Sequence, residues 1–231
     1  MKVLSEDERR ASERFRFQKD RSQYIVAHGL LRYALSTKCS RIDATSWRFR
    51  RNRWGRPEIA EPRKGAQLRF SLSHTQGLAA CAVAWDVAIG IDVEDTARPL
   101  PILEIAERVF SSEERMVLEA LDMKHRGRRF FQLWTLKEAY AKARGIGLSL
   151  PLERASFEVT QQAEVRACLE APLGDLDGPW HFELFCPGDR HVGAIALERP
   201  ALAPRGRIVG CNCRTKTIPQ AGTIGPRSVA K

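Results

Sequence analysis

Three carboxylates and one lysine lie in two short segments whose residue types suit phosphate chemistry. Asp92 and Glu94 belong to Gly-Ile-Asp-Val-Glu, and Glu138 and Lys142 belong to Trp-Thr-Leu-Lys-Glu-Ala-Tyr-Ala-Lys-Ala further along the chain. Carboxylate oxygens are hard ligands for Mg²⁺, which completes its octahedron with water and substrate phosphates. A lysine four positions after Glu138 adds a point cation that suits a phosphate group. The two segments therefore predict a magnesium site that handles a phosphorylated substrate.

The hydrophobic pattern predicts the elements that must position these residues. The apolar run Leu78–Ile91 predicts a buried strand, at whose end Asp92 and Glu94 share one face because they are alternate residues. The second segment has helical periodicity, so Glu138 and Lys142 lie one turn apart. The predicted core face of this helix carries Phe130, Leu133, Leu136 and Tyr140, with Phe131 and Trp134 beside it.

Each segment also has a simpler interpretation. An Asp-x-Glu sequence after a strand is often a solvated turn, and Glu138 with Lys142 matches an exposed i,i+4 ion pair. Taken singly, neither segment decides between a metal site and an ordinary surface. The interpretation as a site depends on finding both segments in one chain.

Together, the segments resemble the signatures of the 4'-phosphopantetheinyl transferase superfamily, a Gly-Ile-Asp-x-Glu strand and a Trp-x-x-Lys-Glu-x-x-x-Lys helix. The length of the chain and its two halves look like the surfactin-synthetase-activating (Sfp-like) branch rather than the short trimeric enzymes of fatty acid synthesis. Further matches follow in family order, namely Trp47 to Phe49, Gly55-Arg56-Pro57, Phe70 to His74, Phe110 to Glu114 and Gly147 to Leu152.

The resemblance implies an α+β (α/β) fold, whereas the residues alone indicate only mixed helix and strand. The family has a pseudo-twofold pair of similar lobes, each a small, mostly antiparallel sheet packed on a long helix. We expect an N-terminal lobe over residues 1–97 and a C-terminal lobe over 98–200, joined by a linker at Asp95–Pro101. Residues 201–231 lack a hydrophobic period and predict a disordered basic tail.

The reaction that the resemblance implies is transfer of 4'-phosphopantetheine from coenzyme A to a serine of an apo acyl or peptidyl carrier protein. The products are the holo carrier protein and 3',5'-ADP. Asp92 and Glu138 are then expected to bind Mg²⁺ or Mn²⁺ directly, and Glu94 directly or through water. Glu138, or a metal-bound water, would accept the serine proton, and Lys142 would steady the pyrophosphate and the departing 3',5'-ADP.

The coenzyme A contacts are carried over from the family residue by residue. Ser73 and His74 resemble a Ser-His pair that binds coenzyme A phosphate. Arg56 stands where the family commonly has the lysine of Gly-Lys-Pro, so a phosphate or adenine contact is expected. The basic flank of the predicted first helix, Tyr24 to Leu35, supplies two further candidates, Lys19 and Arg21.

Two positions fit the family pattern less well. Gln23 occupies a position that is usually basic. Glu114 matches the carboxylate of Phe-Ser-x-x-Glu, but glutamate is favoured in the first turn of any helix because of the helix dipole. We therefore place Glu114 below the metal set.

The net charge of +10 is unevenly distributed. Residues 1–70 carry 18 basic and 8 acidic side chains, residues 71–200 carry 14 and 20, and residues 201–231 carry 6 and none. A basic first lobe facing an acidic metal-binding region fits a polyphosphate ligand bound between them. One alternative is a basic nucleic-acid-binding module that uses Arg14-Phe15-Arg16-Phe17 and the tail, although it leaves the carboxylates unexplained. The other is a family member that binds coenzyme A or a carrier protein without catalysis.

The remaining features predict a cytoplasmic monomer. The six cysteines form no Cys-x-x-Cys pair, so we expect free thiols and no zinc site. Residues 1–10 lack an apolar signal segment, and no apolar stretch approaches the roughly twenty residues that span a bilayer. We expect no nucleic acid and no membrane among the partners, and the two-lobed branch is monomeric. The sequence does not indicate which carrier protein is served.

Overall fold

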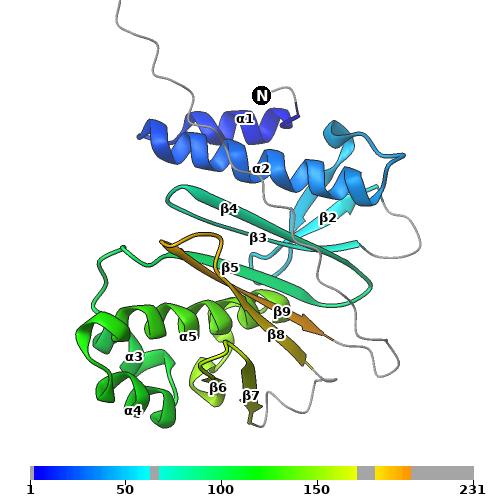
Figure 1. The fold of residues 1–231 in the computed structure, drawn as a ribbon. Helices are drawn as coiled ribbons and strands as arrows, with labels where there is room; N and C mark the ends of the chain where they lie inside the picture. The colour runs from blue at the N-terminus through cyan, green and yellow to red at the C-terminus, as the bar shows by residue number, and fades with distance from the viewer. Residues whose placement is uncertain (1–2, 63–67, 171–179, 199–231) are drawn as a thin grey trace, which may run out of the picture.

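The computed structural model describes residues 3–62, 68–170 and 180–198, so the predicted tail lies outside the described residues. In the first half of the chain, the long helix α2 (Gln18–Lys38) covers an antiparallel hairpin, and the short helix α1 (Glu6–Glu13) packs on α2 (Figure 1). The other elements of this half are the short 3₁₀ turn η1 (Ala44–Ser46), β1 (Arg48–Arg51), β2 (Pro57–Glu61), β3 (Leu68–Thr75) and β4 (Leu78–Trp85).

The second half repeats this plan, with a three-stranded antiparallel sheet in the order β5-β9-β8 against one long helix, and with β6 paired to β7. Its helices are α3 (Ile102–Val109), α4 (Ser112–Ala120) and α5 (Met123–Arg144), followed by the 3₁₀ turns η2 (Gly147–Ser149) and η3 (Leu152–Arg154). Its strands are β5 (Ile89–Asp95), β6 (Ala155–Val159), β7 (Val165–Leu169), β8 (Trp180–Phe185) and β9 (His191–Glu198).

The predicted fold class is confirmed, since each half packs a small antiparallel sheet on a helix of 21 or 22 residues. One element differs from the prediction, because the apolar run Leu78–Ile91 is two strands rather than one. Asp86, at a φ of 54°, turns the chain between β4 and β5. The strand β4 pairs with β3 of the first half, and β5 pairs with β9 of the second. The strands of the two halves therefore separate at residues 86–88, upstream of the expected linker at Asp95–Pro101.

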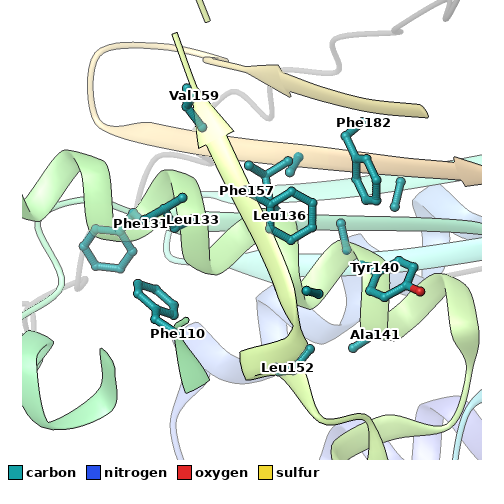
Figure 2. Close-up of a cluster of buried hydrophobic side chains, with 14 of the residues drawn as sticks. Phe110, Phe131, Leu133, Leu136, Tyr140, Ala141, Leu152, Phe157, Val159 and Phe182 are labelled. Atoms are coloured by element: carbon teal, nitrogen blue, oxygen red, sulfur yellow. The ribbon is translucent and has the colours of Figure 1, made fainter. Parts of the chain in front are cut away.

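The long helix α5 has clear start and stop signals. Asp122 caps it by accepting a hydrogen bond from the backbone N–H of His125, and Gly145 ends it in the left-handed conformation that glycine adopts without strain. The predicted core face is buried throughout, at Phe130, Leu133, Leu136 and Tyr140. Figure 2 shows part of this face packed against the aromatic side chains of β6 and β8.

The strand β5 lies directly on α5. A Cβ atom at Gly90 would come 1.8 Å from the carbonyl oxygen of Ala139, so only glycine fits at this point of the Gly-Ile-Asp sequence. This close approach brings Asp92, two residues further along β5, next to the last turns of α5. The glycine thus sets the spacing between the two predicted signature segments.

A row of hydroxyl groups joins the two halves along β3 and β5. Among the described residues the two strands share no backbone ladder. Instead, Ser71, Ser73 and Thr75 accept hydrogen bonds from the backbone N–H groups of Ile91, Val93 and Asp95, at 3.1, 3.3 and 3.2 Å. Alternate side chains of a strand share a face, so β3 presents all three hydroxyls to β5. We call these contacts the hydroxyl seam.

The helix α2 is longer than predicted, and the preceding helix α1 was not predicted. A buried carboxylate attaches α1 to α2, since Glu8 accepts hydrogen bonds from Arg32 Nε at 2.8 Å and pairs with His28 Nδ1 at 3.0 Å. Glu8 also completes a capping box with Ser5 at the start of α1. Within the described ranges, every helix is too short or too polar to cross a bilayer.

Candidate active site

Asp92 is at the centre of the site, in β5, and is only 4% exposed. Its Oδ1 atom accepts hydrogen bonds from Ser73 Oγ at 2.8 Å and from Lys142 Nζ at 2.6 Å. Its Oδ2 atom is buried and has no hydrogen-bond partner within the described part of the chain. An unpaired buried carboxylate oxygen is costly, so Oδ2 is an acceptor suited to a cation or a donor from a ligand.

Burial and the negative charge of Asp92 raise the pKa values of the other two carboxylates, Glu94 and Glu138. Burial raises the pKa of Glu138, and Asp92 and Glu94 raise it further, while Lys142 opposes them. Burial and Asp92 likewise raise the pKa of Glu94, which Arg98 and Trp134 oppose. The ion pair between Lys142 and Asp92 brings the end of β5 to the last turns of α5, and the binding of a metal by the three carboxylates stays a prediction.

Lys142 forms its ion pair with Asp92 of β5 rather than with Glu138 of its own helix. The predicted alternative was an exposed ion pair with Glu138, whereas Lys142 forms an ion pair with Asp92 at 2.6 Å. Two of the three N–H donors of its ammonium group are directed at Asp92 and Ser73. The side chain is 31% exposed, so the third donor is available to a ligand.

The three carboxylates fit a magnesium ion by donor chemistry. They offer hard oxygen atoms, one of which is buried and unpaired, and Mg²⁺ needs only one or two protein carboxylates besides water and phosphate. In the part of the chain that the structure describes, no three His, Cys, Asp or Glu side chains are already arranged as a metal cage. Lys142 holds Oδ1 of Asp92, which leaves Oδ2 as the oxygen able to bind a metal.

His74 and Gln23 meet beside the hydroxyl seam. Gln23 Nε2 of α2 lies 3.2 Å from His74 Nδ1 and also donates to the carbonyl oxygen of Thr75. Partial burial lowers the pKa of His74, and the charge of Lys142 lowers it further, while a backbone hydrogen bond opposes them. The sequence marked Gln23 only as a departure from the family, yet it is the α2 side chain that contacts a predicted coenzyme A ligand.

Arg56 lies where four segments meet. Its Nη1 atom donates to the carbonyl oxygen of Ala143 at 2.7 Å, and its Nη2 atom to those of Phe70 and Ile89 at 3.4 and 3.3 Å. A cation at the last carbonyls of α5 also interacts favourably with the negative end of the helix dipole. Both terminal nitrogen atoms of Arg56 thus contact backbone of the two halves, which gives it a clear structural role.

Lys19 and Arg21 are not brought to the site. Both lie in the first turns of α2, where Lys19 is exposed and its ammonium lies 6.0 Å from the centre of the Phe17 ring. No contact within the described part of the chain joins either side chain to the Asp92 cluster. Their expected contact with coenzyme A stays a prediction.

Sequence reasoning missed a second buried ion pair. Lys137, which precedes Glu138 in the helix signature, is buried and lies 2.7 Å from Glu114. Lys137 also donates to the carbonyl oxygens of Leu152 and Ala155, and Glu114 accepts from the backbone N–H groups of Ser111 and Phe157. The pair joins α4, α5 and β6, so two of the motif residues support the second half rather than the chemistry.

Comparison with known proteins shows the family of the chain. A family model described as the 4'-phosphopantetheinyl transferase superfamily matches residues 88–196, and one described as 4'-phosphopantetheinyl transferase, N-terminal, matches residues 1–85. The chain is 33% identical over 196 residues to 4'-phosphopantetheinyl transferase HetI of Nostoc sp., covering 84% of this chain and 78% of HetI. This chain belongs to the 4'-phosphopantetheinyl transferase superfamily.

Other relatives extend the comparison of this transferase. It is 33% identical over 200 residues to 4'-phosphopantetheinyl transferase Sfp of Bacillus subtilis, covering 87% of this chain and 84% of Sfp. The solved structure of holo-[acyl-carrier-protein] synthase of Thermotoga maritima matches 48% of this chain and 63% of its own, with a TM-score of 0.41 and 24% identity. The predicted family and the prediction of an enzyme are both confirmed. The two family models meet between residues 85 and 88, where the sheets also divide.

Proposed function

We propose that the Asp92 site transfers 4'-phosphopantetheine from coenzyme A to a carrier-protein serine with the help of one Mg²⁺ ion. Asp92 and Glu138 would bind this ion directly, and Glu94 directly or through a water molecule. When bound, the ion neutralises negative charge on the pyrophosphate, which is the main demand of phosphoryl transfer. Mn²⁺ prefers the same oxygen donors and would serve in its place.

The observation that carries the proposal is the buried Oδ2 atom of Asp92, which has no hydrogen-bond partner among the described residues. A buried carboxylate that existed only for stability would have both oxygens paired. Here one oxygen is held by Ser73 and Lys142, while the other stays unpaired beside two more acidic side chains. This is the arrangement expected of a ligand that is fixed before its cation arrives.

Glu138 is the proposed general base, directly or through a metal-bound water. Glu138 lies on α5 one turn before Lys142, whose ammonium pairs with Asp92, and a general base must lie within hydrogen-bond reach of the proton that it accepts. The serine oxygen of the carrier would attack the β-phosphorus of coenzyme A as its proton leaves for this acceptor. The bond from this phosphorus to the bridging oxygen breaks, and 3',5'-ADP leaves with that oxygen.

Lys142 would stabilise the negative charge that develops on the pyrophosphate and on the leaving group. Its third N–H donor is available for a phosphate oxygen, because the first two are directed at Asp92 and Ser73. A donor that is already oriented stabilises charge without reorganising during the reaction. We also propose that His74, on β3, borders the coenzyme A phosphates.

The protein is proposed to act as a cytoplasmic monomer on acyl or peptidyl carrier proteins. Both halves of one chain contribute to the site, since Ser73 belongs to the first half and Asp92 to the second, so the described site needs no second copy. The described cysteines, Cys39, Cys81, Cys168 and Cys186, are free thiols, which suits a reducing compartment.

Incubation with coenzyme A, Mg²⁺ and a panel of apo carrier proteins, followed by intact mass measurement, tests the proposal. We expect one phosphopantetheine mass gain on a carrier serine, which is lost when the metal is chelated. Asp92→Ala and Glu138→Ala are expected to abolish the gain while the protein stays folded. Glu119→Ala, at an exposed acid on α4, is the matched control. Transfer that persists in either site variant at saturating Mg²⁺ would contradict the site assignment.

A further inference from the structure

Ser73 differs from the other two members of the hydroxyl seam. All three hydroxyls accept a hydrogen bond from β5. Ser73 alone also contacts charged groups of the site, because its Oγ donates to Asp92 Oδ1 at 2.8 Å and accepts from Lys142 Nζ at 3.0 Å. Ser71 is buried to the same degree, at 6% exposure, and its hydroxyl accepts the hydrogen bond from Ile91.

The hydrogen-bonding capacity of the Ser73 hydroxyl is fully used. A serine hydroxyl has one donor and two acceptor positions. The donor is directed at Asp92, and the two acceptor positions receive the backbone N–H of Val93 and the ammonium of Lys142. A phosphate oxygen accepts hydrogen bonds and cannot donate to Ser73, so binding phosphate would require the hydroxyl to release Asp92.

The geometry points to Ser73 as a positioning residue, supplied by the first half of the chain, that orients the Asp92 carboxylate and the Lys142 ammonium of the second half rather than binding coenzyme A phosphate. By holding Oδ1, Ser73 leaves Oδ2 as the oxygen that remains for the metal. By accepting from Lys142, it fixes the direction of the remaining ammonium donor. This inference rests on the proposed metal site and adds a residue that acts through the ligands.

The test is a measurement of Mn²⁺ binding, in which the electron paramagnetic resonance signal of the free ion gives the unbound concentration. The enzyme is saturated with coenzyme A, and no carrier protein is present. Loss of an interaction that orients a metal ligand typically weakens metal binding about 10- to 100-fold. We expect Ser73→Ala to show a loss of this size, with a fall in kcat and little change in the KM for coenzyme A. Ser73→Thr keeps the hydroxyl and should restore Mn²⁺ affinity.

Ser71→Ala is the matched control, because it removes the same kind of seam bond from the same strand without touching Asp92. It should bind Mn²⁺ like the wild type. The inference is overturned if Ser71→Ala loses as much affinity as Ser73→Ala. It is equally overturned if Ser73→Ala binds Mn²⁺ normally and raises the KM for coenzyme A more than for dephospho-coenzyme A.

The test also distinguishes failure of the inference from misfolding of a variant and from failure of the proposed metal site. If Ser73→Ala does not fold, Ser73→Cys carries the same test, because a thiol fills the site but is a weak donor. Normal Mn²⁺ binding by Ser73→Cys would then overturn the inference. A wild-type enzyme that binds no Mn²⁺ in the presence of coenzyme A would overturn the metal site and the inference together. Wild-type binding that the Ser73 variants leave unchanged would overturn the inference alone.

Discussion

The ammonium nitrogen of Lys142 on α5 lies 2.6 Å from Oδ1 of Asp92 on β5. One cation is therefore already bound to the residue that is proposed to hold the metal. The pair orients both groups before any ligand arrives, and it leaves the second carboxylate oxygen unpaired. In the proposed site, Lys142 would connect the metal ligand Asp92 to a phosphate of coenzyme A.

Lys142→Met is expected to lower kcat about 10²- to 10³-fold, the usual cost of losing one preorganised donor to a developing negative charge. Methionine keeps much of the side-chain volume, so the helix should remain folded. Lys124→Met, at an exposed lysine in the first turn of the same helix, should leave kcat unchanged. Steady-state kinetics with a carrier protein measures both. A near-normal kcat for Lys142→Met would contradict the proposed role.

Acid stability should depend on Glu8. Burial acts to raise the pKa of Glu8, but hydrogen bonds from His28, Arg32 and the Ser5 backbone lower it from 4.5 to about 2. Because the folded pKa is depressed, this group stabilises the protein above pH 4.5, and the contribution disappears as the pH falls toward 2. Allowing for solvent screening, we expect Glu8→Gln to cost roughly 2 to 3 kcal/mol at pH 7.

Urea unfolding at several pH values measures this effect. The free energies of unfolding of wild type and Glu8→Gln should converge as the pH falls from 4.5 toward 2, because the unfolded wild type takes up a proton on Glu8 over this range while the folded protein keeps the carboxylate ionised until about pH 2. Glu13→Gln, at an exposed position at the end of the same helix, should follow the wild type at every pH. A difference between wild type and Glu8→Gln that does not change with pH would show that lost packing, and not charge, is responsible.

Lys137 should prove to be structural although it precedes the proposed base. Removing one partner of a buried ion pair typically costs about 3 to 5 kcal/mol, so Lys137→Met should lower the unfolding free energy by that amount. The double variant Glu114→Leu/Lys137→Met should cost less than the sum of the single changes. At a temperature where the variant is folded, its kcat should remain near wild type. A stable but inactive Lys137→Met would place Lys137 in the chemistry.

His74 and Arg56 should differ in their response to the 3'-phosphate of coenzyme A. We expect His74→Ala to weaken coenzyme A more than dephospho-coenzyme A, by roughly tenfold or more for one charged hydrogen bond. Arg56→Ala should instead lower the melting temperature and affect both ligands equally, because its terminal nitrogens are bonded to backbone carbonyls. Calorimetric titration with the two ligands separates these cases. Equal losses for His74→Ala would place His74 away from the 3'-phosphate.

The signature segments could be placed from the sequence because their patterns are local. Helical periodicity predicted the buried face of α5, and the position of Glu138 and Lys142 one turn apart follows from the same period. The apolar run Leu78–Ile91 misled because two buried strands in succession have the same composition as one longer strand. The turn at Asp86 separates the two strands, and the apolar residues on either side of it, Trp85 and Val87, do not indicate a turn.

The contacts that complete the site could not be predicted in the same way. Ser73 meets Asp92 and Lys142 across the two halves, at sequence separations of 19 and 69 residues. Glu114 matched a family motif, but its partner Lys137 had no pattern that distinguished a buried lysine from an exposed one on the same helix. Such pairings depend on how whole elements pack together, so local sequence carries no direct record of them.

The hydroxyl seam gives one strand two independent sets of amide protons. The odd-numbered amides of β5, at Ile91, Val93 and Asp95, are bonded to side chains of β3. Donors of an antiparallel strand alternate between its two edges, so the even-numbered amides face β9. In native-state hydrogen exchange, the odd amides report separation of the two halves and the even amides report opening of the sheet. Deuterium uptake along five consecutive residues can thus distinguish a breathing motion of the whole molecule from local fraying within one half.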